Sequence, residues 1–244
     1  MSAGLLAQLK MLNLGGVIES LEVRVAQANS GQLSYEEFLG LVIQDEIERR
    51  EARKLNRRLR QAAFEEEKTI EGFDFSFNPG IPGKKVRELA AGMWLARHEN
   101  VLVCGHPGVG KTHLAQALGH QACRQGRTVR FTKASALFRE LAMARSDHTW
   151  EPTVRAYTKP DVLVVDDFGL KALTQAQADD IAEIVSERYL RGGMIFTSNR
   201  RVDEWQALFP DPVFANSVLD RLAHNAHQLI IEGDSYRKKK RPDQ

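Results

Sequence analysis

Eight consecutive residues have the types and spacing of a phosphate-binding loop. They follow the pattern Gly-x-x-x-x-Gly-Lys-Thr and comprise Gly105, His106, Pro107, Gly108, Val109, Gly110, Lys111 and Thr112. Glycines let backbone N–H groups point at phosphate oxygens, a lysine at this place reaches the β and γ phosphates, and a threonine hydroxyl joins the coordination shell of magnesium. The pattern predicts that these residues and the adjoining His113 bind ATP and Mg²⁺, with Lys111 also acting in catalysis and Thr112 as a metal ligand.

Two further groups of polar residues follow apolar stretches. Asp166 and Asp167 come directly after such a stretch, as in a Walker B motif. Asp166 is the predicted metal ligand, and Asp167 is predicted to polarise the attacking water. An acid pair alone is more often a turn or a helix cap, so the phosphate-binding loop is what favours catalysis. Asn199 is a candidate for orienting the lytic water, although a Ser-Asn pair at a strand end is usually turn chemistry.

A parallel sheet would bring these residues to one edge. Five apolar stretches alternate mostly with helix-length segments and are the expected strands: Asn100–Cys104, Thr128–Thr132, Val162–Asp166, Met194–Ser198 and Gln228–Glu232. Such alternation is typical of an α/β domain with helices on both faces of the sheet. One expected strand separates the two Walker strands in sequence, as in P-loop ATPases whose Walker strands are not neighbours in the sheet.

The first 68 residues have helical patterns and no strand signal. They predict a small all-helical domain over residues 1–68, followed by the α/β domain over residues 69–244. The best-marked helix starts with a capping box formed by Ser34 and Glu37. Its expected apolar face consists of Tyr35, Phe38, Leu39, Val42 and Ile43.

Basic residues gather farther along this helix. Between residues 49 and 60 there are seven basic residues and one acid. The arginines recur every fourth position, so one side of the helix could follow a phosphate backbone; the candidate DNA contacts are Arg49, Arg53, Arg57 and Arg60. The alternative is a solvated face whose charges pair within the helix. Lys238 and Lys239 in the basic tail are further candidates, or belong to a frayed, soluble end.

Composition indicates an ordinary globular protein, with 43% hydrophobic and 27% charged residues. No apolar run approaches the ~18 residues that span a bilayer, so we expect a cytoplasmic protein with no membrane partner. The two cysteines, Cys104 and Cys123, are too few for a disulfide framework and are expected in the core.

With these motifs, the sequence resembles the AAA+ superfamily and, within it, the IstB-like ATPases. These are transposition helper proteins of insertion sequences and relatives of DnaC-type helicase loaders. The resemblance is carried by residues 33–39 running into Glu48-Arg49-Arg50, the linker Phe73-Asp74-Phe75, and residues 219–222 and 234–237. It implies a P-loop NTPase (AAA+) three-layer fold without a full lid.

The resemblance also implies roles for two arginines. Arg221 would be an arginine finger that reaches the ATP site of a neighbouring subunit, and Arg237 would be a phosphate sensor. An ion pair within the chain, with Asp220 or another acid, is the alternative for Arg221. Asp167 stands where many AAA+ proteins have Glu, which implies slow hydrolysis.

The implied function is ATP-dependent assembly of a homo-oligomer, a ring or a helical filament, on duplex DNA. The assembly would recruit or stimulate a transposase in DNA transposition. The alternatives are a DnaC-like loader of a replicative helicase and an adaptor that binds ATP without hydrolysing it.

Overall fold

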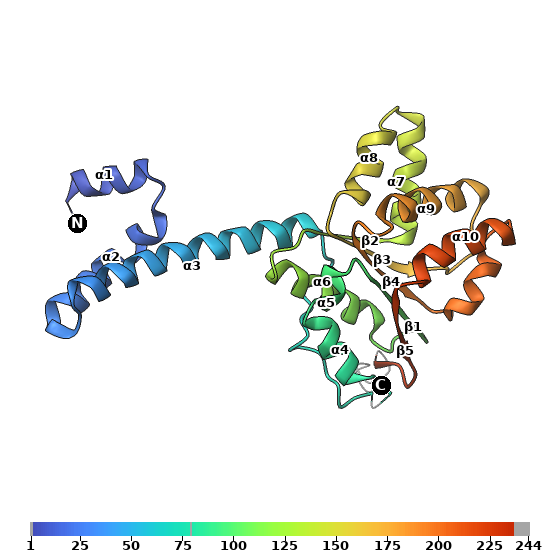
Figure 1. The fold of residues 1–244 in the computed structure, drawn as a ribbon, viewed down its shortest axis with the longest axis horizontal. Helices are drawn as coiled ribbons and strands as arrows, with labels where there is room; N and C mark the ends of the chain where they lie inside the picture. Colours follow the sequence, from blue (N-terminus) through green and yellow to red (C-terminus); the bar gives the residue numbers. More distant parts are fainter. Residues whose placement is uncertain (1, 79, 237–244) are drawn as a thin grey trace, which may run out of the picture. The chain divides into compact units, whose positions relative to one another are not determined.

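The chain folds into two compact units, Met1–Arg57 and Arg58–Gln244. The computed structural model describes residues 2–78 and 80–236 (Figure 1). The division between the units lies within helix α3 (Tyr35–Ala62), whereas the sequence places the domain boundary after residue 68. The residues that follow α3 pack on the larger unit, because Phe64 contacts Phe131 and Glu65 forms an ion pair with Lys133. Residues 58–68 therefore belong structurally to the α/β unit.

The smaller unit contains α1 (Ala3–Met11), α2 (Gly15–Gln27), the π-helical turn η1 (Ala28–Gln32) and the first part of α3. The predicted capping box is present, since the Glu37 N–H donates to Ser34 Oγ and the Ser34 N–H donates to a Glu37 carboxylate oxygen. The Glu46 carboxylate accepts from the N–H of Gly16 at 2.6 Å, at the start of α2. A Cβ on Gly16 would lie 2.6 Å from Glu46 Cα, so this glycine permits the close approach of α2 to α3.

The predicted apolar face of α3 is partly wrong. Val42 is buried and Phe38 packs against the small core of Leu9, Val17 and Val42. However, Tyr35, Leu39 and Ile43 are 96%, 57% and 50% exposed. The short helices α1 and α2 cover a strip of α3 that is narrower than the apolar face read from the sequence.

Five strands of the described chain form one parallel sheet in the order β2-β3-β4-β1-β5. They are β1 (Asn100–Gly105), β2 (Val129–Lys133), β3 (Val162–Phe168), β4 (Gly193–Ser198) and β5 (Ala226–Ile231). All five expected strands form, with shifted ends. Strand β4 separates β1 from β3, so the two Walker strands are not neighbours, as predicted.

Helices cover both faces of the sheet, which gives the predicted three layers (Figure 1). One core joins the sheet to α7 (Ala134–Ser146), α8 (Trp150–Thr158), α9 (Gln175–Arg188), the 3-10 helix η2 (Val202–Leu208) and α10 (Pro212–Ala223). On the other side lie α4 (Gly83–Ala90), α5 (Met93–Ala96) and α6 (Lys111–Arg124). Cys104 and Cys123 are free and buried, as expected. Within the described residues, no helix is long and apolar enough to cross a membrane.

Candidate ATP site

The phosphate-binding loop connects the end of β1 to the first turn of α6. Gly110 precedes the helix with φ 102°, a conformation that residues with a side chain rarely adopt. At the start of the loop, a Cβ on Gly105 would lie 2.2 Å from the carbonyl oxygen of Ile231 in β5. Backbone conformation and crowding therefore require glycine at these two positions. The N-terminal end of α6 then faces the loop, where its positive dipole end favours an anion.

Lys111 is held inside this loop. Its side chain is 5% exposed, and Nζ donates to the carbonyl oxygen of His106 at 2.9 Å and to Asn199 Oδ1 at 2.7 Å. Asn199 follows β4, the strand next to β1. The structure thus brings the predicted lysine and the predicted water-orienting amide into direct contact.

Thr112 and Asp166 lie together, as their predicted role in one metal site requires. The Thr112 hydroxyl is 3.0 and 3.1 Å from the two carboxylate oxygens of Asp166. Asp166 is 1% exposed, and this burial raises its pKa, while hydrogen bonds from Thr197 and Thr112 act in the opposite direction. A hydroxyl and a carboxylate are the hard oxygen ligands that Mg²⁺ takes in nucleotide sites.

Asp167 has a backbone conformation that the sequence did not reveal. Its φ is 57°, in the left-handed region, and the pairing of β3 with β4 shifts between Val165 and Phe168. Its N–H donates to Thr197 Oγ1 at 2.9 Å rather than to a strand carbonyl. Left-handed non-glycine residues at such irregularities cluster at functional sites.

A cavity of about 730 Å³ joins these groups. The predicted residues that line it are Pro107, Gly108, Val109, Gly110, Lys111, Thr112, His113, Asp166, Asp167 and Asn199. Gly105 and His106 are not among its lining residues; His106 contributes through its carbonyl contact with Lys111. This volume lies within the range of small-molecule and cofactor pockets.

The cavity also has a wall that sequence reasoning missed. The ring of Phe73 lies 3.2 Å from the position of a Cβ on Gly110 and meets the His113 ring edge to face at 4.9 Å. The N–H of Tyr236 donates to the Gly108 carbonyl oxygen at 2.9 Å, and its ring packs on Phe77. Linker and C-terminal residues therefore cover the loop. In the sequence, both segments contributed only to the resemblance to IstB-like ATPases, and nothing in them predicted contact with the loop.

Burial and surroundings also affect His113. Its Nε2 lies 3.2 Å from the Thr69 carbonyl oxygen, and burial lowers its pKa. We expect a neutral ring at neutral pH, so His113 adds shape and a hydrogen-bonding group to the cavity rather than charge.

Arg221 lies outside this cavity, on α10. Its guanidinium donates to the carbonyl and hydroxyl oxygens of Ser217, and among the described residues it has no ion pair with Asp220 or any other acid. The guanidinium is therefore not neutralised by an acid of the described chain. Arg237, Lys238 and Lys239 lie outside the described residues.

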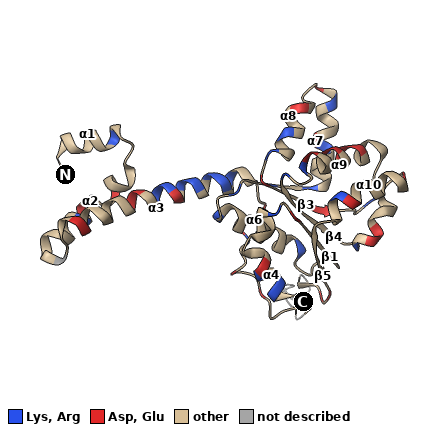
Figure 2. Ribbon diagram, in the orientation of Figure 1, with Lys and Arg blue, Asp and Glu red and all other residues tan. Residues whose placement is uncertain are grey.

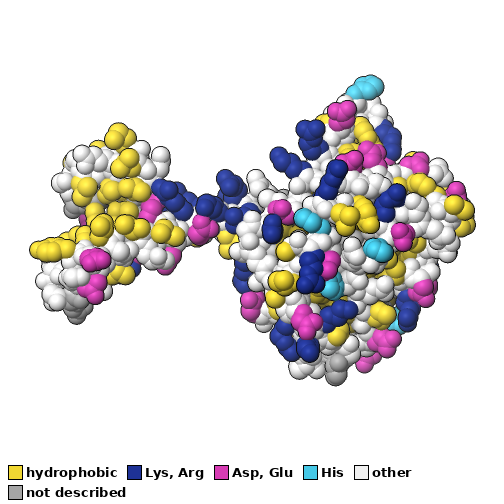
Figure 3. Space-filling view, in the orientation of Figure 1, with side chains coloured by type: hydrophobic (Ala, Val, Ile, Leu, Met, Phe, Trp, Pro, Cys, Tyr) yellow, Lys and Arg dark blue, Asp and Glu magenta, His cyan; other side chains and the backbone are white. Residues whose placement is uncertain are grey.

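Lys and Arg gather along the later part of α3 (Figures 2 and 3), and ion pairs hold only some of them. Arg49 pairs with Glu19 and Arg50 with Glu46, so internal pairing holds for part of the stretch. Within the described residues, the exposed side chains with no ion pair include Arg53, Arg57 and Arg60.

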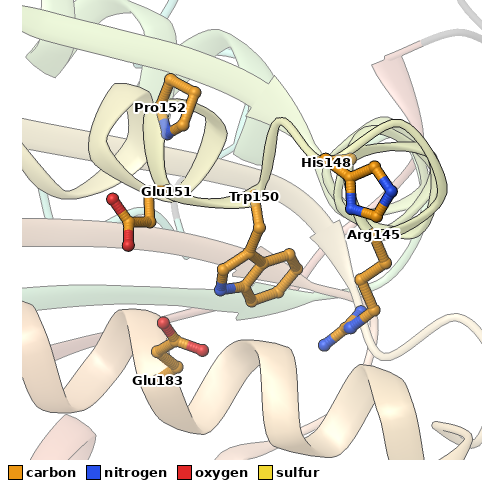
Figure 4. Close-up of a pocket in the computed structure, with 7 residues that line it drawn as sticks. Arg145, His148, Trp150, Glu151, Pro152 and Glu183 are labelled. Carbon is orange, nitrogen blue, oxygen red and sulfur yellow. The ribbon is translucent and has the colours of Figure 1, made fainter.

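A second hollow, of about 660 Å³, lies at α7, α8 and α9, away from the predicted site residues (Figure 4). Arg145 lines it and stacks on Trp150 with 4.1 Å between the guanidinium carbon and the ring centre. The same guanidinium pairs with the buried carboxylate of Asp180. These contacts within the chain hold the Arg145 side chain between α8 and α9.

Fold and site together define a P-loop ATP-binding protein of the AAA+ type. The Walker motifs lie on strands separated by β4, and their side chains meet in one cavity. The sequence matches the family model described as IstB-like ATP binding protein over residues 7–244, and the chain belongs to this family.

Relatives of similar length support this assignment. An ATP-binding protein in an insertion sequence of Mycobacterium tuberculosis is 47% identical over 235 residues, which cover 96% of this chain and 94% of the relative. The IS21 ATP-binding protein of Pseudomonas aeruginosa is 39% identical over 237 residues, covering 97% and 88%.

Solved structures show the same fold at lower identity. The DnaC helicase loader has a TM-score of 0.53 at 23% identity, covering 61% of this chain and 86% of DnaC. The replication initiator DnaA bound to AMPPCP and single-stranded DNA has a TM-score of 0.60 at 21% identity, covering 70% and 52%. The α/β unit thus has the fold seen in DnaC and DnaA.

Proposed function

We propose that this protein is a magnesium-dependent ATPase that assembles on duplex DNA when ATP is bound and then recruits or stimulates a transposase. The observation that carries the ATPase part is the convergence of Lys111, Thr112, Asp166 and Asp167 on one cavity. The family and its insertion-sequence relatives support the link to transposition.

The residues of the cavity fit a magnesium ion that is shared with ATP. Thr112 and Asp166 would hold it, and the ion would neutralise charge on the phosphates. Among the described residues, no group of three or more His, Cys, Asp or Glu could hold a metal ion. A magnesium ion bound together with substrate phosphates needs only one or two protein carboxylates.

The chain's own groups then have distinct tasks. Lys111 and the loop N–H groups bind and orient the phosphates, which is the main source of catalysis in phosphoryl transfer. The Asp167 carboxylate takes a proton from the attacking water, and the Asn199 amide orients that water. Arg221 of one subunit supplies positive charge to the ATP site of the next, so hydrolysis requires assembly.

DNA binding is assigned to the basic stretch of α3. Arg53, Arg57 and Arg60 are exposed and free of ion pairs with described acids, so they can neutralise phosphates without first breaking internal pairs. Arg49 would have to exchange its pair with Glu19. Phosphate contacts carry little sequence information, which suits a protein that accepts many target sites.

The test is binding to duplex and single-stranded DNA of equal length at one moderate salt concentration, with ATP or with ADP. We expect ATP-dependent, cooperative binding that prefers duplex DNA. Arg57→Ala should weaken binding to all sequences and lower the log–log salt slope by about 1. Lys10→Ala is the matched control, because it removes an exposed positive charge from α1 of the same unit. Preference for single strands would instead favour a DnaC-like helicase loader.

A second test separates an ATPase from an adaptor. Phosphate release is measured with Mg²⁺ and ATP for the wild type and for Asp167→Asn. We expect slow release that DNA stimulates, and loss of release with retained ATP binding in the variant. Absence of release by the wild type, with or without DNA, would favour the adaptor.

A further inference from the structure

Thr197 is a buried residue that touches both Walker B acids with a single hydroxyl. It is 0% exposed at the C-terminal end of β4. Its Oγ1 donates to Asp166 Oδ1 at 2.5 Å and accepts from the N–H of Asp167 at 2.9 Å. A hydroxyl has one proton and two lone pairs, so both bonds can exist at once.

The position of this hydroxyl coincides with a β-bulge. Val165 pairs with Phe196 and Phe168 pairs with Ser198, so three steps along β3 match two steps along β4. The extra residue lacks a place in the ladder, and a buried N–H without a partner is costly. The Thr197 hydroxyl supplies the partner that β4 backbone does not give to Asp167.

The bulge also explains how two consecutive acids reach the same cavity. Successive side chains of a regular strand point to opposite faces of the sheet. Asp166 and Asp167 nevertheless both line the ATP cavity, and Asp167 has a φ of 57° at the bulge. A backbone in the left-handed region at this point redirects the second carboxylate. Whatever stabilises the bulge therefore determines where the second carboxylate lies relative to the first.

We infer that Thr197 is a positioning residue of the ATP site: its hydroxyl orients the Asp166 carboxylate for magnesium and fixes Asp167 in the left-handed conformation that the reaction uses. This inference rests on the proposed ATPase function. The two residues that follow Thr197 bond to other groups. Ser198 Oγ donates to the Phe168 carbonyl oxygen, and Asn199 Oδ1 accepts from Lys111. Thr197 is thus the residue of β4 that joins the two acids.

The experiment compares Thr197→Val, which keeps the shape and removes the hydroxyl, with Thr197→Ser, which keeps the hydroxyl. Two kinds of quantity are measured: the kinetic constants of phosphate release, kcat and KM, and the Mg²⁺ concentration that gives half of the ATP-dependent rise in melting temperature. The second quantity reports binding without turnover. Thr132→Val is the matched control, because Thr132 is buried near the end of β2 and its hydroxyl donates to the Lys133 carbonyl oxygen.

For Thr197→Val we expect a ~10- to 100-fold fall in kcat and a rise of similar size in the half-saturating Mg²⁺ concentration, as for other residues that orient metal ligands. KM for ATP at saturating Mg²⁺ should change less. Thr197→Ser should retain both properties within a few fold even if its melting temperature falls, and Thr132→Val should match the wild type.

Two results would overturn the inference. One is a wild-type Mg²⁺ requirement and kcat in folded Thr197→Val. The other is equal loss of both properties in Thr197→Ser, which would indicate a role in packing alone and can be measured even if the valine variant does not fold. If the wild type released no phosphate, the ATPase proposal would fail, while the Mg²⁺ titration of ATP binding would still decide the role of Thr197.

Discussion

Arg188 provides a stringent test of how the α/β unit is held together. The side chain is 1% exposed at the end of α9, and its guanidinium donates to five backbone carbonyl oxygens. These belong to Tyr157, Thr158, Pro160, Asp161 and Gly193, at distances of 3.1, 3.0, 2.7, 3.1 and 2.8 Å. The contacts fasten the end of α8 and the loop before β3 to the first residue of β4.

The substitution Arg188→Met removes all of these donors while keeping an apolar side chain in place. Burial lowers the pKa of Arg188 to about 10, so the side chain is charged at neutral pH. Breaking a buried charged network typically costs about 3–5 kcal/mol of stability. Part of this cost is offset in Arg188→Met, because the substitution removes the charge and leaves none buried without a partner. We expect a loss of about 3 kcal/mol in the free energy of unfolding, which lowers the melting temperature by roughly 6–12 °C.

The assay is urea unfolding followed by tryptophan fluorescence, which reports on the buried Trp205 in the same unit. Arg191→Met is the control, because that side chain is 76% exposed and should change stability by less than ~0.5 kcal/mol. ATP binding by folded Arg188→Met should stay normal, since the network lies at the N-terminal ends of β3 and β4. A loss below about 1 kcal/mol would refute the reasoning that these carbonyls depend on Arg188.

Three further predictions concern the ATP site, the core and the N-terminal unit. Arg221→Ala should reduce phosphate release by roughly 10³-fold or more while leaving the ATP-dependent rise in melting temperature intact; normal turnover would exclude a role in trans. Burial raises the pKa values of Cys104 and Cys123 to about 11, so neither thiol should react with Ellman's reagent at pH 8 until the protein unfolds. The hydrogen bond from Arg24 lowers the pKa of Asp45 from 3.8 to about 2. The stabilisation that ionised Asp45 provides should therefore be complete above about pH 4 and be lost towards pH 2. Urea unfolding followed by circular dichroism should show the free energies of unfolding of the wild type and Asp45→Asn converging as the pH falls over that range. A difference that does not change with pH would contradict the role of Asp45.

The sheet and the Walker motifs could be predicted because their signals are local. Each strand is a short run of apolar residues bounded by residues that favour turns. The loop from Gly105 to Thr112 needs glycines at fixed positions because of its backbone conformation and close contacts. The meeting of Thr112 with Asp166 also followed, since parallel strands end at the same edge of the sheet.

Other features depended on contacts between distant segments. Phe73 and Tyr236 cover the phosphate-binding loop, although they are far apart in the sequence of the α/β unit. No hydrophobic periodicity in either segment indicates these contacts. On α3, an apolar side chain such as Leu39 satisfies the helical pattern whether or not α1 and α2 are long enough to cover it. The left-handed φ of Asp167 is likewise a property of the pairing between β3 and β4.

Strand order accounts for the link between the two Walker motifs. Because β4 lies between β1 and β3, short side chains at its end can reach both neighbours. Asn199 accordingly contacts Lys111 on the β1 side, and Thr197 contacts Asp166 on the β3 side. Thr112 also touches Asp166 directly, but the Lys111 amine and the N–H of Asp167 are bonded to side chains at or just after the end of β4. The polar end of β4 therefore has a physical task in this site that the Walker motifs alone do not perform.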